Sequence, residues 1–302
     1  MEREAEEAIR NVRRSTGLQI LGMGQWATDP ACRDCLHSIA ANVNNHFAVI
    51  EGLARSGQIR PLRQIALSEG DDPVPVEERP LRIGVYPLAA NPLHWGHILL
   101  GLATMASMTL DKVVFIIAGT DRRKPSMLSA ETRHRLGRAV LGTFDPVFAY
   151  SSLALGTGLD GETNFGRLLT LNSRQRMKAF YIAGSDHYRR TTAQGEPDTI
   201  QKLEWVVAEQ EKAGNTLHTV SAVFLDRAGV SRQQGGVATF LRVDVLPALP
   251  LSFSSTAVRH ALCKEVFCED LALLPYSCLL EIRMGGLYVG KGECAEEAES
   301  LA

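Results

Sequence analysis

The feature that most constrains the fold is an alternation of short apolar runs with helix-like stretches, which begins at Leu81. Near-continuous β-branched and aromatic runs suit strands that are buried on both faces of a parallel sheet. Such runs predict strands at Leu81 to Tyr86, Lys112 to Ala118, Ala179 to Ala183, His218 to Leu225 and Phe240 to Leu246. The stretches between them predict helices at His97 to Met108, Ser129 to Leu141, Thr199 to Ala213 and Ser254 to Leu262. This alternation predicts an α/β fold with a doubly wound parallel sheet, in which ligands bind beyond the carboxyl ends of the strands.

The first 79 residues differ from the rest and are predicted to form a helical N-terminal extension. Glu2 to Arg14 is charged and helix-friendly, and apolar residues between Asp34 and Ala54 recur at the three- and four-residue steps of a helix. The stretch from Ser68 to Pro80 is rich in Pro, Gly and acidic residues, which is typical of a linker. We therefore expect residues 1–79 to be extension and linker, and residues 80–302 to be the α/β domain with a helical tail.

Composition excludes several classes of protein. The chain of 302 residues is 45% hydrophobic and 22% charged, close to the globular average, which excludes disorder throughout. Its net charge of −2 argues against a nucleic-acid binder with a basic surface. No segment is long and apolar enough to span a bilayer, and the charged N-terminus lacks the apolar core of a signal peptide. We expect a cytoplasmic protein that binds neither nucleic acid nor membranes.

The cysteines give no strong signal. Six of them are scattered along the chain, and cytosolic thiols are normally reduced, so no disulfide framework is expected. Cys32 and Cys35 have CxxC spacing, but no second ligand pair follows at the spacing of a zinc finger. His37 and His46 lie nearby, which leaves a metal as the alternative reading. The helix-like context favours two small helix residues, and we assign no metal site.

The first chemical signal is the run Asn91-Pro92-Leu93-His94-Trp95-Gly96-His97, between a predicted strand and a predicted helix. Backbone N–H groups and the dipole at a helix N-terminus attract anions. Gly96 lets the backbone come close to a ligand. The imidazoles of His94 and His97 can donate hydrogen bonds to phosphate oxygens as negative charge develops. Two surface histidines in a loop would give the same pattern, so the motif alone does not decide.

The second signal is Ser254-Ser255-Thr256, at the start of another predicted helix, with Arg259 one turn further on. Hydroxyl and N–H groups at such a point can hold phosphates, and an arginine can neutralise them. An ordinary N-cap followed by a solvated arginine gives the same pattern, so this signal alone is weak. The two signals together are far more specific than either one.

Together these motifs resemble the nucleotidylyltransferase superfamily, which carries (His/Thr)-x-Gly-His after the first strand and an Ile-Ser-Ser-Thr-x-x-Arg-like motif late in the domain. Within it, the sequence is most similar to the nicotinate/nicotinamide mononucleotide adenylyltransferases. Four further features are similar to the family pattern. Lys124-Pro125 resembles a lysine-containing loop of the family, and Glu131-Thr132-Arg133 resembles the helix that follows that loop. Tyr181 to Asp186 is similar to a strand end with the pattern Ile-x-Gly-x-Asp, and Trp205 is similar to a tryptophan that follows it. The resemblance covers about Leu81 to Leu262 and implies a Rossmann-like nucleotidylyltransferase fold.

The resemblance implies transfer of AMP from ATP to the phosphate of nicotinate or nicotinamide mononucleotide, with Mg²⁺ on the phosphates and release of pyrophosphate. The acceptor phosphate would attack in line, so catalysis would be positioning plus charge neutralisation. His94, His97, Lys124 and Arg259 would be the catalytic residues. The substrates would be held by Leu88, Ala89, Ala90, Asn91, Gly96, Gly184, Asp186, Ser254, Ser255, Thr256 and Arg133. Whether the protein is a homo-oligomer stays open.

The loop before the histidines departs from the family pattern Gly-Gly-(Ser/Thr)-Phe-Asp-Pro. Here the run is Pro87-Leu88-Ala89-Ala90-Asn91-Pro92, in which Pro87 lacks an N–H group and Ala89 lacks a hydroxyl. Two alternatives therefore stay open: a relative with another acceptor, such as phosphopantetheine, an alcohol phosphate or a sugar phosphate, and a nucleotide-binding regulator without turnover. A class I aminoacyl-tRNA synthetase is disfavoured, because a Lys-Met-Ser-Lys-Ser-like loop and a basic surplus for tRNA are both missing.

Overall fold

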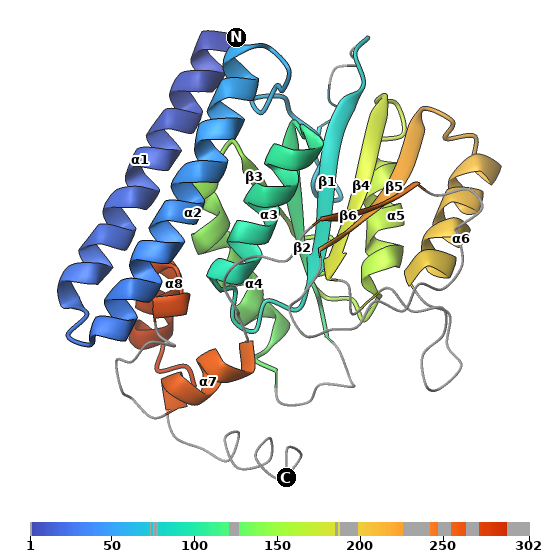
Figure 1. Cartoon of the computed structure of the whole chain (residues 1–302). Helices are drawn as coiled ribbons and strands as arrows, with labels where there is room; N and C mark the ends of the chain where they lie inside the picture. Colours follow the sequence, from blue (N-terminus) through green and yellow to red (C-terminus); the bar gives the residue numbers. More distant parts are fainter. Residues whose placement is uncertain are drawn as a thin grey trace.

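One parallel sheet organises the molecule (Figure 1). The computed structural model describes residues 2–72, 74, 76, 78–120, 127–184, 187, 199–225, 242–246, 255–263 and 272–288. Six strands pair in the order β3-β2-β1-β4-β5-β6, and every neighbouring pair is parallel. They are β1 (Leu81–Leu88), β2 (Lys112–Ile117), β3 (Phe148–Ser151), β4 (Met177–Gly184), β5 (His218–Leu225) and β6 (Arg242–Leu246). The strand order reverses between β1 and β4, which confirms the doubly wound sheet; in folds of this kind, ligands bind beyond the carboxyl ends of the strands at such a reversal.

Helices cover both faces of the sheet. Successive strand residues point to opposite faces, so Val85 lies in one apolar core and Tyr86 lies in the other. The face of Tyr86 is covered by α3 (Trp95–Met108) and α4 (Ala130–Leu141). The face of Val85 is covered by α5 (Gly161–Leu171) and α6 (Thr199–Lys212). Two shorter helices, α7 (Ser255–Cys263) and α8 (Tyr276–Met284), add residues to the core on the α3 side.

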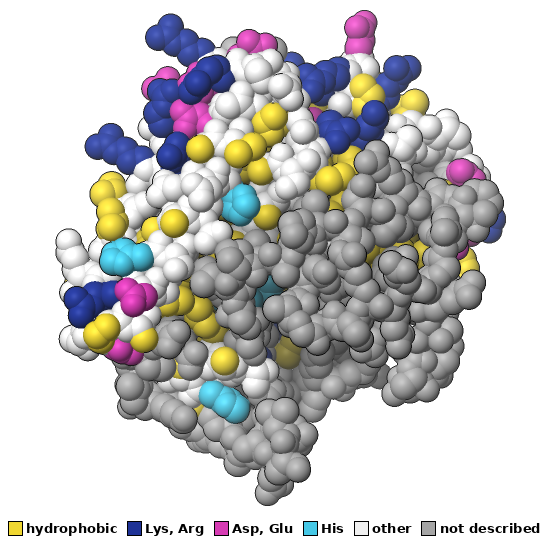
Figure 2. All heavy atoms as spheres, viewed as in Figure 1, with side chains coloured by type: hydrophobic (Ala, Val, Ile, Leu, Met, Phe, Trp, Pro, Cys, Tyr) yellow, Lys and Arg dark blue, Asp and Glu magenta, His cyan; other side chains and the backbone are white. Residues whose placement is uncertain are grey.

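The N-terminal extension is a hairpin of two long helices, α1 (Glu2–Trp26) and α2 (Pro30–Arg55), as Figure 1 shows. Asp29 caps α2 by accepting a hydrogen bond from the N–H of Ala31 at 3.0 Å, and Pro30 occupies the first helical position. The predicted apolar stripe of α2 is buried. At one end of the hairpin, arginines of both helices pair with Glu6 and Glu51 on a charged surface (Figure 2).

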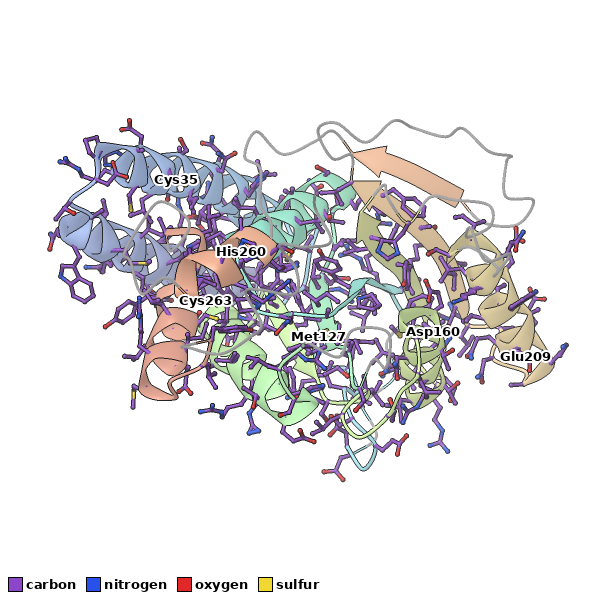
Figure 3. The ribbon with its side chains drawn as sticks, turned by 90° about the horizontal axis from the view of Figure 1, so that it is seen from below. Cys35, Met127, Asp160, Glu209, His260 and Cys263 are labelled. Carbon is purple, nitrogen blue, oxygen red and sulfur yellow. The ribbon has the colours of Figure 1, made fainter. Side chains whose placement is uncertain are left out.

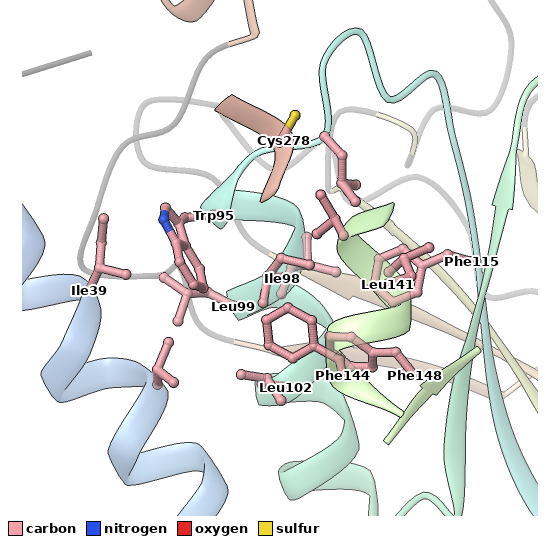
Figure 4. Packing of buried hydrophobic residues seen from close by; sticks show 14 of the residues in the cluster. Ile39, Trp95, Ile98, Leu99, Leu102, Phe115, Leu141, Phe144, Phe148 and Cys278 are labelled. Carbon is pink, nitrogen blue, oxygen red and sulfur yellow. The ribbon is translucent and has the colours of Figure 1, made fainter. Parts of the chain in front are cut away.

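The hairpin packs on α3 and shares its core. Trp95, the residue between the two histidines of the motif, is 0% exposed. Its ring meets that of Phe144 edge-on, with 6.4 Å between centroids, and Ile39 of α2 faces it from the hairpin (Figure 4). Phe47 of α2 stacks on the same Phe144 at 6.5 Å. Trp95 is therefore a packing residue that ties the extension to the helix carrying the histidines.

The chain between α2 and β1 crosses to the opposite face of the sheet. Ile65 is buried in the core on the α5 side. The side chain of Asn172 holds the backbone of Ala66 from both sides, accepting from its N–H and donating to its carbonyl at 2.9 Å each. The hydroxyl groups of Ser68 and Ser152 lie 2.7 Å apart. The described residues of the predicted linker are thus irregular in structure, and its first residue, Ser68, contacts Ser152 beside the sheet.

The structure also contains elements that the sequence analysis did not predict, namely β3, α5 and a short 3-10 helix, η1 (Gly142–Phe144), whereas α8 lies in the predicted helical tail. Cys263, at the end of α7, is disulfide-bonded, a bond that the sequence analysis did not predict. In the described part of the chain, no helix is both long enough and apolar enough to cross a membrane.

Candidate functional site

The loop after β1 turns sharply into α3 at the carboxyl edge of the sheet. Ala90 has a φ of 51°, in the left-handed region, and the peptide bond between Asn91 and Pro92 is cis. His94 is the N-cap of α3, with extended backbone at φ −128° and ψ 170°, and the helix begins at Trp95. This path places His94 and His97 in the first turn of a 14-residue helix, where backbone N–H groups and the helix dipole favour an anion.

The two imidazole rings are stacked, with 3.8 Å between centroids and 25° between planes. His94 is 5% exposed, and His97 is half-buried. The Nδ1 atom of His97 accepts a hydrogen bond from the backbone N–H of His94 at 3.2 Å. Because Nδ1 acts as an acceptor, the proton of a neutral His97 resides on Nε2. An Nε2–H group can donate a hydrogen bond to a phosphate oxygen.

Asn91 joins the two motifs that the sequence analysis singled out. Its main-chain oxygen accepts a hydrogen bond at 3.0 Å from Nη1 of Arg259, which is 168 residues away in sequence. The other terminal nitrogen of Arg259 donates to the hydroxyl of Thr256 at 3.2 Å. Thr256 and Ser255 stand in the first turn of α7, and both are half-buried. The first turn of α7, with its hydroxyl groups, is thus linked through Arg259 to the loop that leads into His94.

The carboxamide oxygen of Asn91 has two further donors. The hydroxyl of Tyr288 donates to it at 2.8 Å, and the backbone N–H of Leu128 donates to it at 3.3 Å. Leu128 lies just before α4, and Tyr288 follows α8. Sequence reasoning did not identify Tyr288, because nothing in its local sequence marks a residue that bonds to a partner 197 positions away.

Arg133 takes a different place from the one we expected. Its side chain is 1% exposed, and its guanidinium donates to the carbonyl oxygens of Leu128, Ala89, Ala118 and Gly119. These carbonyls come from the ends of β1 and β2 and from the segment before α4. The buried guanidinium is turned toward the backbone, so this position does not support the phosphate contact that we predicted. Arg133 instead holds together the loops around the site.

The remaining predicted residues fall into two groups. Leu88, Ala89, Ala90 and Gly184 lie at the carboxyl ends of the neighbouring strands β1 and β4 or directly after them, and Gly96 is buried in the first turn of α3. The carbonyl oxygen of Leu88 accepts from the N–H of Ala118 at 2.8 Å, which continues the pairing of β1 with β2. Lys124, Asp186 and Ser254 lie outside the described residues.

The other side of the carboxyl edge is formed by α5 and α6. Asp160 caps α5 by accepting from the N–H of Thr163 at 2.8 Å, and it pairs with Lys202 of α6 at 3.1 Å. Tyr181 of β4 donates its buried hydroxyl to Glu162 at 2.9 Å. Burial, together with the Glu162 carboxylate, raises the pKa of Tyr181 well above its ordinary value. This hydroxyl therefore stays protonated and acts as a donor.

A surface groove of about 550 Å³ is lined by residues of α5 and α6. Asp160 and Glu209, on its two helices, are labelled in Figure 3, on the side of the sheet away from Cys35 in the hairpin. Trp205 lines the groove and is 59% exposed. The tryptophan that we compared with the family pattern therefore lies on α6, seven residues into the helix.

Comparison with known proteins adds independent findings. No protein-family model matches the sequence. The chain is 28% identical over 134 residues to a probable nicotinate-nucleotide adenylyltransferase of Thermoanaerobacter sp. (strain X514), a match that covers 44% of this chain and 59% of that protein. It is 24% identical over 192 residues to the probable nicotinate-nucleotide adenylyltransferase of Synechococcus sp. (strain JA-3-3Ab), which covers 63% of this chain and 87% of that protein.

The fold is similar to that of the nicotinic acid mononucleotide adenylyltransferase of Plasmodium falciparum, solved in complexes with APC and with NaAD. The TM-scores are 0.52 and 0.53, the sequence identities are 14% and 15%, and the matches cover 69% of this chain and 97% of that one. This chain is similar to nicotinate-nucleotide adenylyltransferases. The resemblance drawn from the two motifs is thereby confirmed, and so is the Rossmann-like fold.

Two parts of the chain lie outside the region of motif resemblance, and both approach the site. The hairpin packs on α3 through Ile39 and Trp95. The segment after α7 contributes Tyr288 to Asn91. The loop that carries the histidines is thus supported from both ends of the chain.

Proposed function

We propose that the protein transfers AMP from ATP to the phosphate of nicotinate mononucleotide, or of its nicotinamide counterpart, and so takes part in NAD biosynthesis. The observation that carries this proposal is the hydrogen bond from Arg259 to the main-chain oxygen of Asn91. It joins the motif that contains the two histidines to the Ser-Ser-Thr motif, between residues that lie 168 positions apart in the sequence. The relatives at 24 to 28% identity and the Plasmodium complexes support the choice of nucleotide and acceptor.

In the proposed reaction, an oxygen of the acceptor phosphate attacks the α-phosphorus of ATP. The bond from that phosphorus to the bridging oxygen of the β-phosphate breaks, and pyrophosphate leaves without a covalent enzyme intermediate. Negative charge that develops on the phosphates lies beside the N-terminal turn of α3 and the Nε2–H donor of His97. Arg259, Ser255 and Thr256 are proposed to hold the leaving phosphates, with Lys124, Asp186 and Ser254 in the roles that the motif implies.

Mg²⁺ is proposed to enter with the nucleotide, on whose phosphate oxygens it neutralises charge. The described residues contain no group of three or more His, Cys, Asp or Glu side chains that could hold a metal ion. The side-chain donors of the two motifs are imidazole, hydroxyl and guanidinium groups, which suit phosphate oxygens rather than a hard cation. These residues therefore fit a nucleotide that brings its own Mg²⁺.

The deciding experiment measures pyrophosphate release from ATP and Mg²⁺ with three acceptors in parallel: nicotinate mononucleotide, nicotinamide mononucleotide and phosphopantetheine. We expect release with a pyridine mononucleotide. The His97→Ala variant should lower kcat by about 10²-fold or more, because it removes a donor aimed at developing charge. His37→Ala is the matched control, since His37 is exposed on α2, and it should leave kcat unchanged.

Each other outcome has a defined meaning. Release with phosphopantetheine alone would keep the reaction class and replace the acceptor. ATP binding without release with any acceptor would favour a nucleotide-binding regulator, a reading supported by Ala89, which lacks a hydroxyl and whose carbonyl is bound to Arg133. An unchanged rate in His97→Ala would remove that residue from the reaction. Failure to bind ATP would overturn the proposal.

A further inference from the structure

We propose that Tyr288, in the turn after α8, is a positioning residue that holds the phosphate-binding loop in its reactive shape through Asn91. The inference rests on the proposed function, since it assigns part of that site to a segment beyond the motif resemblance. The phosphate-binding loop is defined here as residues 89–94.

The contact between Tyr288 and Asn91 is buried and specific. Tyr288 is 6% exposed and Asn91 is 5% exposed, and the phenolic hydroxyl lies 2.8 Å from Oδ1. The N–H of Leu128 lies 3.3 Å from the same oxygen. A backbone N–H can only donate, so the carboxamide must present its oxygen there, and Tyr288 must donate as well. Two donors therefore define the orientation of the Asn91 side chain.

The backbone around Tyr288 is held in place by contacts with neighbouring elements. It has a φ of 63°, a left-handed conformation that non-glycine residues adopt rarely and keep only when their surroundings hold it. The turn before it is closed by a hydrogen bond from the N–H of Leu287 to the carbonyl of Ile282 at 3.0 Å. The helix α8 is anchored on α4 by the pair of Arg135 with Glu281 at 2.8 Å. The hydroxyl is thus presented by a packed element.

The phosphate-binding loop depends on Asn91 for its shape. Ala90, just before it, is itself in the left-handed region, and His94 follows three residues later as the N-cap of α3. The main chain of Asn91 also carries the hydrogen bond from Arg259. A change in the orientation of Asn91 would therefore move the histidines and the arginine relative to each other. Small misplacements of this kind lower the rate of a reaction that depends on positioning.

The first test is Tyr288→Phe, which keeps the buried ring and removes only the hydroxyl. We expect kcat for pyrophosphate release to fall about 5- to 10-fold while KM for ATP changes less than about 2-fold, because the loop still binds phosphate but holds it less accurately. The matched control is Tyr150→Phe, which also removes a hydroxyl; the partner of that hydroxyl, Nδ1 of His134 at 2.7 Å, is not part of the phosphate-binding loop. It should leave kcat unchanged. An equal loss of kcat in both variants would mean that Tyr288 only stabilises the fold and does not position the loop.

The second test asks whether Tyr288 acts through Asn91. In an Asn91→Ala background, Tyr288→Phe should have no further effect on kcat, because the acceptor of its hydrogen bond is already gone. If the effects of the two substitutions on kcat were fully additive, Tyr288 would not act through Asn91, and the inference would be overturned. If Asn91→Ala does not fold, Asn91→Ser serves as the partner variant in the same cycle.

A third measurement separates this inference from the proposed function. The imidazole NMR signals of His94 and His97 can be assigned in the full-length protein without substrates, using the His97→Ala variant. Tyr288→Phe should shift these signals and Tyr150→Phe should not. This readout stands even if the wild-type protein releases no pyrophosphate. Unmoved histidine signals in Tyr288→Phe would overturn the inference, whatever the activity of the wild type.

Discussion

Arg133 is a cation at the centre of the loops that surround the site. Its guanidinium has five N–H donors in a rigid fork, which suits several acceptors at once. Four carbonyl oxygens from three separate segments surround it, and water does not reach it. The carbonyl dipoles replace the water that the charge would otherwise keep. An arginine that the motif pattern assigned to phosphate can therefore serve loop structure in this chain.

Replacing Arg133 with Met should lower the free energy of unfolding by about 3 kcal/mol or more, because several buried carbonyl oxygens would lose their donors at once. Urea unfolding followed by circular dichroism measures this loss. The control is Arg138→Met on the exposed face of the same helix, for which we expect a change within about 0.5 kcal/mol. If the Arg133→Met variant were as stable as wild type but had lost affinity for ATP, the result would support the predicted contact of Arg133 with phosphate instead.

At the scale of elements, the first residues of α5 pack directly against the sheet. A methyl group at Gly161 would lie 2.8 Å from Cβ of Pro87 and 2.9 Å from the hydroxyl of Tyr181. Glycine therefore allows α5 to approach the ends of β1 and β4. The same approach places Glu162 within reach of the Tyr181 hydroxyl. One small residue thus helps to set the spacing of the carboxyl edge on the α5 side.

We expect Gly161→Ala to lower the free energy of unfolding by about 1 to 3 kcal/mol, because the added methyl group overpacks this junction. Gly22→Ala should do the opposite. Gly22 is inside α1 with no atom within 4 Å of the added methyl group, so alanine should stabilise the helix by up to about 1 kcal/mol. Thermal and urea unfolding of the two variants beside wild type would check both signs. A neutral Gly161→Ala would mean that α5 can move away at no cost.

At the scale of the whole molecule, the N-terminal residues contact both faces of the sheet. The hairpin joins the core on the α3 side, and Ile65 joins the core on the α5 side. Two hydrogen bonds between the side chain of Asn172 and the backbone of Ala66, one donated by each residue, close this second contact. The extension that precedes the sheet in sequence is therefore part of its packing, and it supports the helix that carries the histidines.

Stability should fall as the pH drops from about 6.5 to 5. Burial lowers the pKa values of His46, His134 and His218 below 6.5, so the unfolded chain binds more protons in this range than the folded chain does. The stability that these neutral rings contribute is fully present above pH 6.5, and it is lost as the pH falls through their lowered pKa values in the folded protein. Urea unfolding at half-unit pH steps measures the slope.

A His46→Gln variant provides the control for this dependence. It should have a shallower slope than wild type between pH 6.5 and 5, because one of the titrating groups is gone. The carboxylates Glu6 and Asp160 have lowered pKa values and contribute only at more acidic pH, so they do not obscure the window. Stability that is flat or rising toward pH 5 would contradict the prediction.

The sequence by itself determined the elements and chemistry that depend on neighbours along the chain. Buried β-branched runs predicted β2, β4 and β5, and helical spacing predicted α2, because the period of apolar residues reflects local geometry. The two motifs at helix starts identified the family resemblance. Short or glycine-containing elements such as β3 and α5 escaped prediction, because four residues, or a helix with two glycines, carry too weak a local signal.

Only the tertiary structure decided which side chains meet at the site. Arg133 was predicted to face phosphate, yet the packing of three loop segments turned it toward their carbonyls. Tyr288 carries no local mark of function, yet the sheet and α8 place it on Asn91 across 197 residues. Such partners are selected by the burial of whole elements against one another. That selection depends on contacts distant in sequence, which local periodicity and spacing do not encode.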